Sequence, residues 1–497
     1  MEHFNVIIVG AGLSGVGAAH YLQAKCPSKT YAILEARSAI GGTWDLFRYP
    51  GVRSDSDMFT LGYRFRPWRA AKAIADGPSI RAYVNETARE EGIDRKIRFN
   101  TRVTDISWDS SNARWTVTAM KDGAPVRLTT DFLWMCSGYY RYTAGHRPEF
   151  PGEKTFRGRI IHPQIWPEDL DYEGKRVVVI GSGATAVTLI PSMTDKAAHV
   201  VMLQRSPTWM FSMPGTSAMA KFLGSFLPAM AVYRLMRLHR IVMQLIIYRM
   251  ARARPKATGE KLLKQARELL PAGYDVEKDF HPRYNPWEQR LCLVPDDDLF
   301  NAISAGNASV ETGEIETFTE TGVRLKNGKE IPADIIITAT GLHIELLGGA
   351  KVAVDGKRVD IADTLTYRGF GFSGLPNLVS VFGYLNASWT LRADLISDYA
   401  TRLLNYMDAN GYKIATPVNN DPAMPREPFA DFSSGYLTRA ADRLPKQGRQ
   451  PWRHAQNFLL DFFVMRYGKI DDGVMKFSKG AMRAPVPERK PVAVAAE

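Results

Sequence analysis

The chain has 497 residues, of which 45% are hydrophobic and 23% charged, a balance that excludes a disordered or fibrous protein. Its length allows roughly two or three domains. Lys and Arg outnumber Asp and Glu by 64 to 52, which gives a net charge of +12. The basic residues are dispersed and no zinc-finger or RNP pattern accompanies them. The charge therefore favours anionic cofactor phosphates, or an acidic membrane surface, over nucleic acid as the partner.

The sequence has three cysteines, which lie far apart and are Cys26, Cys136 and Cys292. No C-x-x-C motif is present. This spacing argues against a disulfide framework, a thiol redox pair and a zinc site, so we expect no metal and a cytoplasmic location. The chain enters an apolar strand-like run almost at once and contains no uncharged apolar run of about 18 residues. We therefore expect neither a signal peptide nor a membrane span.

The pattern at the start of the chain predicts a dinucleotide-binding unit. Residues 5–9 form a β-branched apolar run typical of a buried parallel strand. A turn follows this run, and after the turn apolar residues recur at helical spacing. The glycines of the turn are Gly10, Gly12 and Gly15. The first glycine permits a tight turn, the second lets a pyrophosphate approach the backbone, and the third lets helix and strand pack closely. The helix N-terminus then offers N–H groups to the phosphates. A second strand, 31–34, ends at Glu35, where an acid accepts a hydrogen bond from a ribose hydroxyl.

The segment after this unit is a loop dense in aromatic and charged residues, from Gly41 to Asp57. Loops at the carboxyl ends of parallel strands carry ligands in such sheets, which favours a site role for Arg53 and Asp55 over a plain surface pair. The patterns that follow predict a helix over 80–92, strands over 97–103, 114–119 and 132–138, and a hairpin near 121–123.

The opening pattern returns in the middle of the chain. A strand over 176–180 leads into the glycine turn 181–186, and a second strand over 200–203 leads into Gln204, Arg205 and Ser206. A neutral residue followed by arginine, where the first unit has Glu35, converts a ribose-hydroxyl site into one for a 2′-phosphate. We therefore expect FAD, or an NAD-like ribose, in the first unit and NADPH in the second. A duplicated fold that kept only one site is the alternative, but it does not predict the arginine.

These patterns predict an α/β fold with two Rossmann-like dinucleotide-binding domains, one for FAD and one for NADPH, and a helical insertion. The expected FAD-binding domain has two parts, and the expected boundaries are 1–145 for its first part, 150–342 for the NADP-binding domain with the insertion at about 215–285, and 343–480 for its second part. Strands over 335–341 and 378–382 and a helix over 391–407 are expected within these ranges. The tail, 483–497, is rich in Pro, Ala and Val and is expected to be disordered.

The segment 217–256 mixes apolar residues with arginines, and on a helical wheel Arg234, Arg237, Arg249 and Arg252 cluster. A basic amphipathic helix of this kind lies on anionic membranes, which would place the protein peripherally on the inner face of the cell membrane. The apolar residues, however, fall almost all round the wheel. A helical insertion packing over the active site explains that pattern as well, and the two interpretations stay open.

The linker between the two units carries the most specific pattern in the sequence, F-x-G-x-x-x-H-x-x-x-W-P, met by Phe156, Gly158, His162, Trp166 and Pro167. With the paired glycine turns, it makes the chain resemble the flavin-dependent (type I) Baeyer–Villiger monooxygenases from about Val6 to about Lys479. The related flavin monooxygenases that oxidise nitrogen and sulfur usually carry tyrosine at the position of Trp166.

The resemblance assigns roles to particular residues. It implies that the FAD contacts, besides the three glycines of the first turn, are Ser14, Glu35, Thr43, Trp44, Asp45, Leu46, Asp55 and Val103. It implies that the NADP contacts are Arg53, Ser54, Gly181, Ser182, Gly183, Ala184, Thr185, Ala186, Val187, Arg205 and Ser206. His162 and Trp166 would couple movement of the NADP-binding domain to the state of the flavin.

The implied reaction uses NADPH and O₂ to form a C4a-peroxyflavin, which converts a ketone into an ester or lactone and also oxidises thioethers and thioamides. Negative oxygen develops in these steps, and a guanidinium is a suitable stabiliser. The family's catalytic arginine matches Arg290, with Asp55 orienting it; a structural ion pair or a phosphate clamp is the plainer interpretation of the same residue. Two rival functions remain, an enzyme that oxidises only nitrogen or sulfur and a non-catalytic NADPH-sensing flavoprotein.

Overall fold

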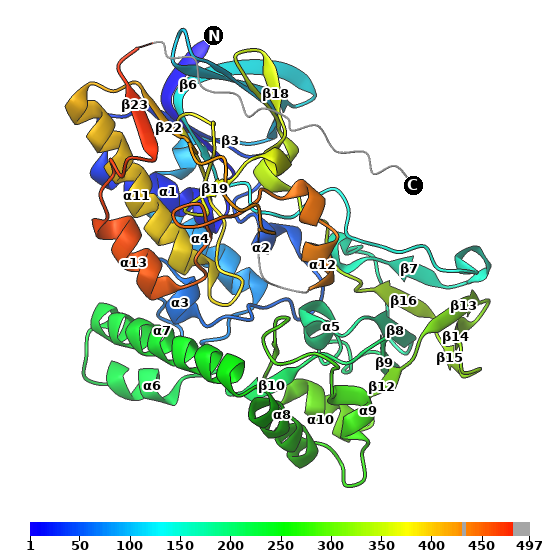
Figure 1. Cartoon of the computed structure of the whole chain (residues 1–497). Helices are drawn as coiled ribbons and strands as arrows, with labels where there is room; N and C mark the ends of the chain where they lie inside the picture. Colours follow the sequence, from blue (N-terminus) through cyan, green and yellow to red (C-terminus); the bar gives the residue numbers. More distant parts are fainter. Residues whose placement is uncertain (430–433, 481–497) are drawn as a thin grey trace.

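The computed structural model describes residues 1–429 and 434–480, and the tail expected to be disordered, 483–497, lies outside these residues. Two sheets, the first mixed and the second parallel, organise this part of the chain, and helices and long loops cover both of them (Figure 1). Each sheet contains the strand, glycine turn and helix expected from the sequence. The boundaries between the two units stay a prediction.

The first sheet is built around β1 (Glu2–Val9), which pairs in parallel with β2 and β6. Its order is β18-β17-β4-β5-β6-β1-β2-β3, and β21 pairs with β6 off this path. The other strands are β2 (Tyr31–Leu34), β3 (Ile97–Arg98), β4 (Thr101–Asp109), β5 (Arg114–Lys121), β6 (Ala124–Met135), β17 (Lys351–Val354), β18 (Lys357–Val359) and β21 (Leu378–Ser380). Because β17, β18 and β21 come from beyond residue 350, the late part of the chain completes the sheet that the first residues begin.

The second sheet is parallel throughout, in the order β12-β9-β8-β16-β7. Its strands are β7 (Arg159–Ile161), β8 (Arg176–Ile180), β9 (His199–Gln204), β12 (Ala308–Thr312) and β16 (Ile335–Thr338). A small antiparallel sheet, β13 (Ile315–Thr319), β14 (Gly322–Leu325) and β15 (Glu330–Pro332), flanks it. A separate parallel pair, β10 (Met210–Met213) and β11 (Cys292–Pro295), leads directly out of the loop that carries Arg290.

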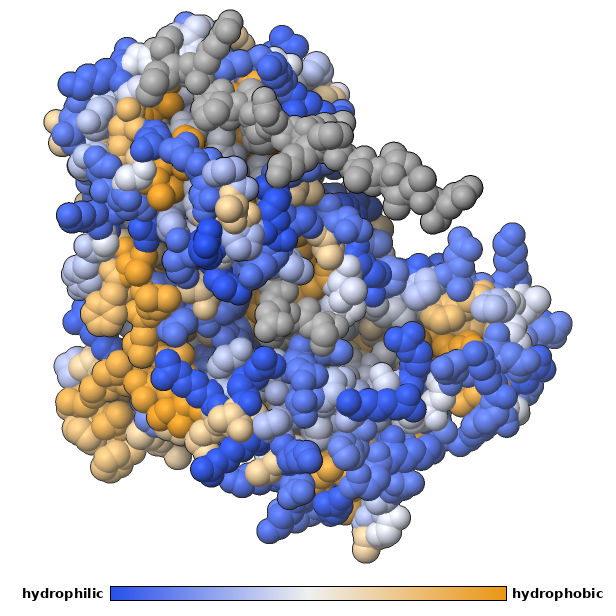
Figure 2. All heavy atoms as spheres, in the orientation of Figure 1, coloured by the Kyte–Doolittle hydropathy of each residue, from blue (hydrophilic) through white to orange (hydrophobic). Residues whose placement is uncertain are grey.

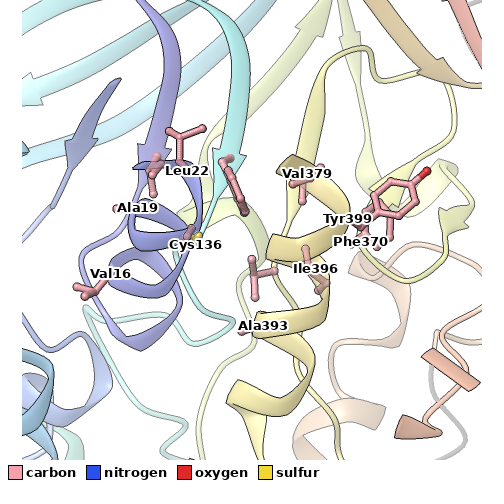
Figure 3. Close-up of a cluster of buried hydrophobic side chains, with 14 of the residues drawn as sticks. Val16, Ala19, Leu22, Cys136, Phe370, Val379, Ala393, Ile396 and Tyr399 are labelled. Carbon is pink, nitrogen blue, oxygen red and sulfur yellow. The ribbon is translucent and has the colours of Figure 1, made fainter. Parts of the chain in front are cut away.

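Helix packing fixes the first glycine turn in place. Helix α1 (Leu13–Lys25) lies against α11 (Trp389–Asn410), and both cover the same face of the first sheet. Figure 3 shows the buried side chains of α1 and α11, among them Ala19 and Ile396, with Cys136, which follows β6, between the two helices. Burial of this apolar surface sets the two helix N-termini side by side, which matters for the site.

The remaining helices surround these layers. They are α2 (Thr43–Leu46), α3 (Met58–Leu61), α4 (Gly77–Glu90), α5 (Ala184–Leu189), α10 (Asp298–Ser304), α12 (Gly435–Thr438) and α13 (Phe458–Tyr467). The segment between β10 and β11 forms α6 (Ala218–Gly224), α7 (Ala229–Ala253), α8 (Pro255–Leu269) and α9 (Val276–Phe280). Across the described residues, no helix is long and apolar enough to cross a membrane.

Most of the expected elements are confirmed, and two expectations are wrong. The single strand expected over 97–103 is two strands, because Asn100 adopts a left-handed conformation (φ +51°) that turns the chain between β3 and β4. Arg237 does not join the other arginines on an exposed face. It is buried against α11, where it pairs with Asp394 (Nη2 to Oδ2, 2.9 Å) and donates to backbone carbonyls of α3 and the turn after it.

Candidate functional site

A cavity of about 850 Å³ lies where the two glycine turns meet. Gly10 and Gly12, at the end of β1, line it from one side, and Gly181 and Gly183, at the end of β8, line it from the other. No side chain caps the first turn of α1 or of α5. The N–H groups and the positive ends of the two helix dipoles are therefore directed at anions from both units.

Each glycine in these turns is required for a different structural reason. Gly10 has φ +104°, and a Cβ there would lie 2.5 Å from the carbonyl oxygen of Cys136. A Cβ on Gly15 would lie 1.8 Å from the carbonyl oxygen of Gly10, so glycine lets helix and strand pack closely. Around Gly183 a Cβ would meet nothing within 4 Å, so the backbone there is open to a ligand. This open cradle fits a pyrophosphate.

Glu35 lies at the end of β2, 4% exposed, and lines the cavity. Its carboxylate accepts hydrogen bonds from the backbone N–H groups of Ala11 (2.7 Å) and Arg37 (2.8 Å). Burial raises its pKa, although these N–H groups act in the opposite direction. Each carboxylate oxygen has a further lone pair, which suits the hydroxyls of an adenine ribose. Val103, on β4, lines the same cavity.

Asp45 lies behind this end of the cavity and does not line it. Its carboxylate pairs with Arg37, Arg48 and Arg81 at 2.7–3.1 Å. Burial opposes ionisation, but the arginines hold the pKa of Asp45 below its ordinary value. The residue therefore anchors the loop that carries Thr43 and Trp44, both of which do line the cavity.

The corresponding end of the second unit has the opposite charge. Arg205 is exposed and lines the cavity, whereas Gln204 is buried. The Gln204 amide donates to the carbonyl of Asp279 (2.7 Å) and to the hydroxyl of Thr312 (2.9 Å), so it serves packing within the second unit. The charged side chain after β9 is therefore a cation, where the first unit presents a carboxylate.

Arg290 and Asp55 face each other in the cavity wall. Arg290 comes from the loop before β11 and Asp55 from the loop before α3, and their side chains are 32% and 35% exposed. The ion pair is bidentate, with Nε 2.7 Å from one carboxylate oxygen and Nη2 2.9 Å from the other. Among the described residues, the one hydrogen-bond partner of Nη1 is the carbonyl of Leu385, at the long distance of 3.4 Å. Burial alone would lower the pKa of Arg290, but the Asp55 carboxylate raises it above the ordinary value.

An aromatic wall stands beside this ion pair. Tyr139 stacks on Trp389 with ring centroids 4.9 Å apart, and Tyr140 and Tyr436 line the same part of the cavity. The indole N–H of Trp389 donates to the hydroxyl of Ser14 (2.8 Å), which joins the wall to the first turn of α1. Burial raises the pKa of all three tyrosines, so their hydroxyls are neutral donors at physiological pH.

Cys292 lines the cavity two residues after Arg290, and burial raises the pKa of its thiol to about 12. It is therefore a neutral thiol near pH 7 and not a nucleophilic thiolate. All three cysteines of the chain are buried and free.

The histidine of the linker fingerprint lies beside the end of β16 in the second unit and does not line the cavity. The Nε2 of His162 lies 3.1 Å from the carbonyl oxygen of Gly341, and its Nδ1 accepts from the N–H of Gln164 (3.2 Å). This pattern places the ring proton on Nε2, and burial lowers the pKa of the ring, so it is neutral. Gly341 itself lines the cavity, and Trp166 packs against the core of the second unit.

The structure brings most of the expected site residues into one cavity. Those that line it are Gly10, Gly12, Ser14, Glu35, Thr43, Trp44, Ser54, Asp55, Val103, Gly181, Ser182, Gly183, Ala184, Thr185, Arg205 and Arg290. Those placed behind it are Gly15, Asp45, Leu46, Arg53, His162, Trp166, Ala186, Val187 and Ser206. Among the latter, Arg53 pairs with Asp298.

Sequence reasoning missed the aromatic wall. Tyr139 and Tyr140 follow the glycine at the end of β6, so the rule that ligands bind beyond the carboxyl ends of parallel strands could have found them. Trp389 begins a helix and carries no local motif, and the same holds for Tyr436 in the short α12.

Comparison with known families and proteins agrees with this geometry. The family model described as flavin-binding monooxygenase-like matches residues 75–348, more than half of the chain. A second model, described as an NAD(P)-binding Rossmann-like domain, matches residues 8–77, which include the first glycine turn and Glu35.

Similar proteins match over nearly the whole chain. The FAD-containing monooxygenase EthA of Mycolicibacterium smegmatis is 53% identical over 480 residues, which cover 96% of this chain and 98% of that protein. EthA of Mycobacterium tuberculosis is 52% identical with the same coverage. Among solved structures, an oxidised steroid monooxygenase bound to NADP superposes with a TM-score of 0.78 at 22% identity, covering 96% of this chain and 100% of that one. At that identity the likeness shows the fold.

Proposed function

Because the chain belongs to the flavin-binding monooxygenase-like family, we propose that it binds FAD and NADPH and converts ketones into esters or lactones by Baeyer–Villiger oxidation. In the same proposal, thioethers and thioamides are oxidised at sulfur by the same site. EthA, which is about half identical over nearly the full length, is named an FAD-containing monooxygenase. The first unit would hold FAD and the second NADPH.

Particular residues would hold each nucleotide. On the FAD side these are the open first turn of α1, Glu35 for the adenine ribose and Ser14 with Trp389 beyond the pyrophosphate. On the NADPH side they are the turn at Gly183 and the cation of Arg205, which suits a 2′-phosphate. When bound, the two cofactors supply reducing equivalents and the activation of O₂.

The observation that carries the proposal is the Arg290–Asp55 pair, held in the wall between the two glycine turns. Asp55 takes up Nε and Nη2 and fixes the plane of the guanidinium. Within the part of the chain that the structure describes, Nη1 makes one long contact, to Leu385, and it is the edge we propose for a reacting oxygen. A permanent cation fixed in advance stabilises negative charge that develops on oxygen without reorganising during the reaction.

The rest of the wall would exclude water. Tyr139, Trp389 and the neutral Cys292 present mainly apolar surface next to the guanidinium. Excluding water strengthens the electrostatic action of Arg290 and suppresses release of reduced oxygen as hydrogen peroxide.

The test is the variant Arg290→Ala, assayed with a ketone and with a thioether. Loss of a fixed donor to a developing oxyanion costs about 10²–10³ in kcat, so ester formation should fall by that factor. NADPH should still bleach the flavin, and the oxygen consumed should appear as hydrogen peroxide.

Product analysis separates the proposal from its nearest rival. Sulfoxide from the wild-type enzyme with no ester from any of a panel of aliphatic, cyclic and aryl ketones would indicate an enzyme that oxidises only sulfur or nitrogen. Unchanged ester formation in Arg290→Ala would refute the role of the arginine.

A further inference from the structure

One side of the molecule exposes an unusually large apolar surface. In the space-filling view, hydrophobic residues gather at the lower left, over α13, α7 and α6 (Figure 2). Phe222 on α6 is 67% exposed and Phe463 on α13 is 61% exposed. Contiguous apolar patches of this kind mark interaction sites on folded proteins. We refer to the exposed apolar side chains of these three helices as the apolar face.

Helix α7 supplies the middle of the apolar face, and its sequence spacing shows that two sides of the helix are apolar. Its inward residues, among them Met236 and Ile241, are buried. Its outward residues recur at intervals of three and four, and they are Leu235, Leu238, Val242, Ile246 and Met250, all of them exposed. A helix that is apolar nearly all round favours a partner on each side, and the described residues cover only the inner side of α7.

The three helices form one continuous face. Phe222 and Phe226 of α6 contact each other edge to face, with ring centroids 5.4 Å apart, and α6 packs beside α7. Phe458 at the start of α13 packs against the cluster that contains Ile241 of α7. Four residues apart on α13, Phe463 and Tyr467 both point outward and are exposed.

The charge on the segment that carries α6 and α7 is of one sign. Between Asp195 and Glu260 the sequence has no acidic residue, and 217–256 contains eight Lys and Arg residues. Arg237 is buried, but Lys221, Arg234, Arg249 and Arg254 are exposed. Basic residues beside an apolar helical face are the pattern of helices that lie in the interface of anionic membranes.

We propose that the apolar face docks on an anionic lipid bilayer, with the side chains of α6, α7 and α13 in the interfacial layer and the basic residues of 217–256 at the headgroups. A second copy of the chain fits this face less well. A two-fold dimer would bring the same arginine-rich segment of each copy together, and the segment contains no acid to pair with them.

The docking face lies one helix away from the candidate active site. On its inner side, α7 contacts Tyr384, which lines the cavity, through Ile241. Tyr248 of the same helix meets Trp287, in the loop that carries Arg290, edge to face at 5.5 Å. Delivery of apolar substrates from the bilayer would follow from this placement; that consequence rests on the proposed function, whereas docking itself does not.

The test is co-sedimentation of the FAD-loaded enzyme with large unilamellar vesicles, either of phosphatidylcholine alone or with about 30% phosphatidylglycerol. We expect the enzyme to bind the anionic vesicles at least about tenfold more tightly than the vesicles of phosphatidylcholine alone. Binding to the anionic vesicles should be lost when the salt concentration is raised from about 0.05 M to about 0.5 M. The combined variant Phe222→Ser, Leu238→Gln, Ile246→Gln and Phe463→Gln, which changes only exposed side chains, should bind at least about tenfold more weakly.

The charge variant is Arg234→Gln with Arg249→Gln, and its matched control is Lys357→Gln with Arg358→Gln on the distant strand β18. The first pair should weaken binding about tenfold and the control pair less than about twofold. For the apolar variant the control is Met120→Gln, on β5. Unchanged thermal midpoints would show that each variant is folded.

Three outcomes would overturn the proposal. Wild-type enzyme that binds neither kind of vesicle would do so, as would an apolar variant that binds as tightly as the wild type. In analytical ultracentrifugation, a wild-type dimer that the apolar variant converts to monomer would show that a second copy covers this face instead.

Discussion

The variant Asp55→Asn tests whether the carboxylate of Asp55 orients Arg290 for catalysis. The substitution keeps the shape of the side chain but removes its charge and one of its two acceptor oxygens. In the structure both oxygens accept from Arg290, at 2.7 and 2.9 Å. In the variant one guanidinium N–H would face the amide NH₂, so the bidentate geometry could not persist.

The size of the effect follows from that geometry. A hydrogen bond to a charged group contributes about 1.5–3 kcal/mol. Because the two side chains are 32% and 35% exposed, solvent screening places the loss at the lower end of that range. A loss of about 1.5–2 kcal/mol in transition-state stabilisation corresponds to a fall of about 10- to 30-fold in the rate of oxygen transfer. The rate of flavin reduction by NADPH should change by less than about twofold, because Arg290 is not required for that step in the proposed scheme.

The assay measures ester formed per NADPH oxidised, with hydrogen peroxide quantified in the same reaction. The matched control is Asp334→Asn, because Asp334 also binds its partner, Arg176, through two contacts, of 3.1 and 2.7 Å, and neither residue lines the cavity. The control should form as much ester per NADPH oxidised as the wild type. A wild-type ratio of ester to NADPH in Asp55→Asn, or an equal fall of that ratio in Asp334→Asn, would refute the orienting role of Asp55.

Three further predictions concern the nucleotides and the pH dependence of stability. Arg205→Gln should lower the ratio of kcat/KM for NADPH to that for NADH by about tenfold, as expected for loss of one cation from a phosphate at an exposed site, and an unchanged ratio would contradict the assignment. Glu35→Gln replaces an acceptor of two backbone N–H groups and should weaken FAD binding about 10- to 30-fold in a fluorescence titration of apoenzyme; equal affinity would remove Glu35 from the site. Arg176 lowers the pKa of Asp334 to about 2, so its stabilisation is present above the unfolded pKa near 4 and is lost as the pH falls toward 2. With 35% of the Asp334 side chain exposed, the expected deficit of Asp334→Asn in unfolding free energy is about 1 kcal/mol at pH 7 and 5 and about half of that at pH 3, and a deficit that grows on acidification would contradict the sign.

Local patterns were enough to find the phosphate-binding parts of the site. Gly10, Glu35, Gly183 and Arg205 each lie within one strand–turn–helix–strand unit, where spacing along the chain fixes position in space. The structure places all four in the lining of one cavity. Their chemistry is encoded over about thirty residues in each unit, so a single sequence suffices to predict it.

The proposed reaction centre is not local in this sense. Asp55 and Arg290 are 235 residues apart in sequence, and only a resemblance could pair them before the structure was known. The aromatic wall joins Tyr139 and Trp389, which are far apart in the sequence, because α11 packs on α1. Likewise, no helical wheel could show that Arg237 is buried, since its partner Asp394 belongs to another helix.

The two glycine turns are alike in their backbone, and the charge beside each turn distinguishes one dinucleotide from another. Each turn offers the same backbone cradle and the same helix dipole, so neither one can distinguish one dinucleotide from another by its phosphates alone. The side chains after the second strand of each unit carry charges of opposite sign. The buried carboxylate of Glu35 would repel a 2′-phosphate, whereas the guanidinium of Arg205 would attract it. In the proposed scheme, charge therefore disfavours NADPH at the first turn and favours it at the second. The nicotinamide and the flavin would then approach each other from opposite sides of the cavity, and Arg290 lies in the cavity wall.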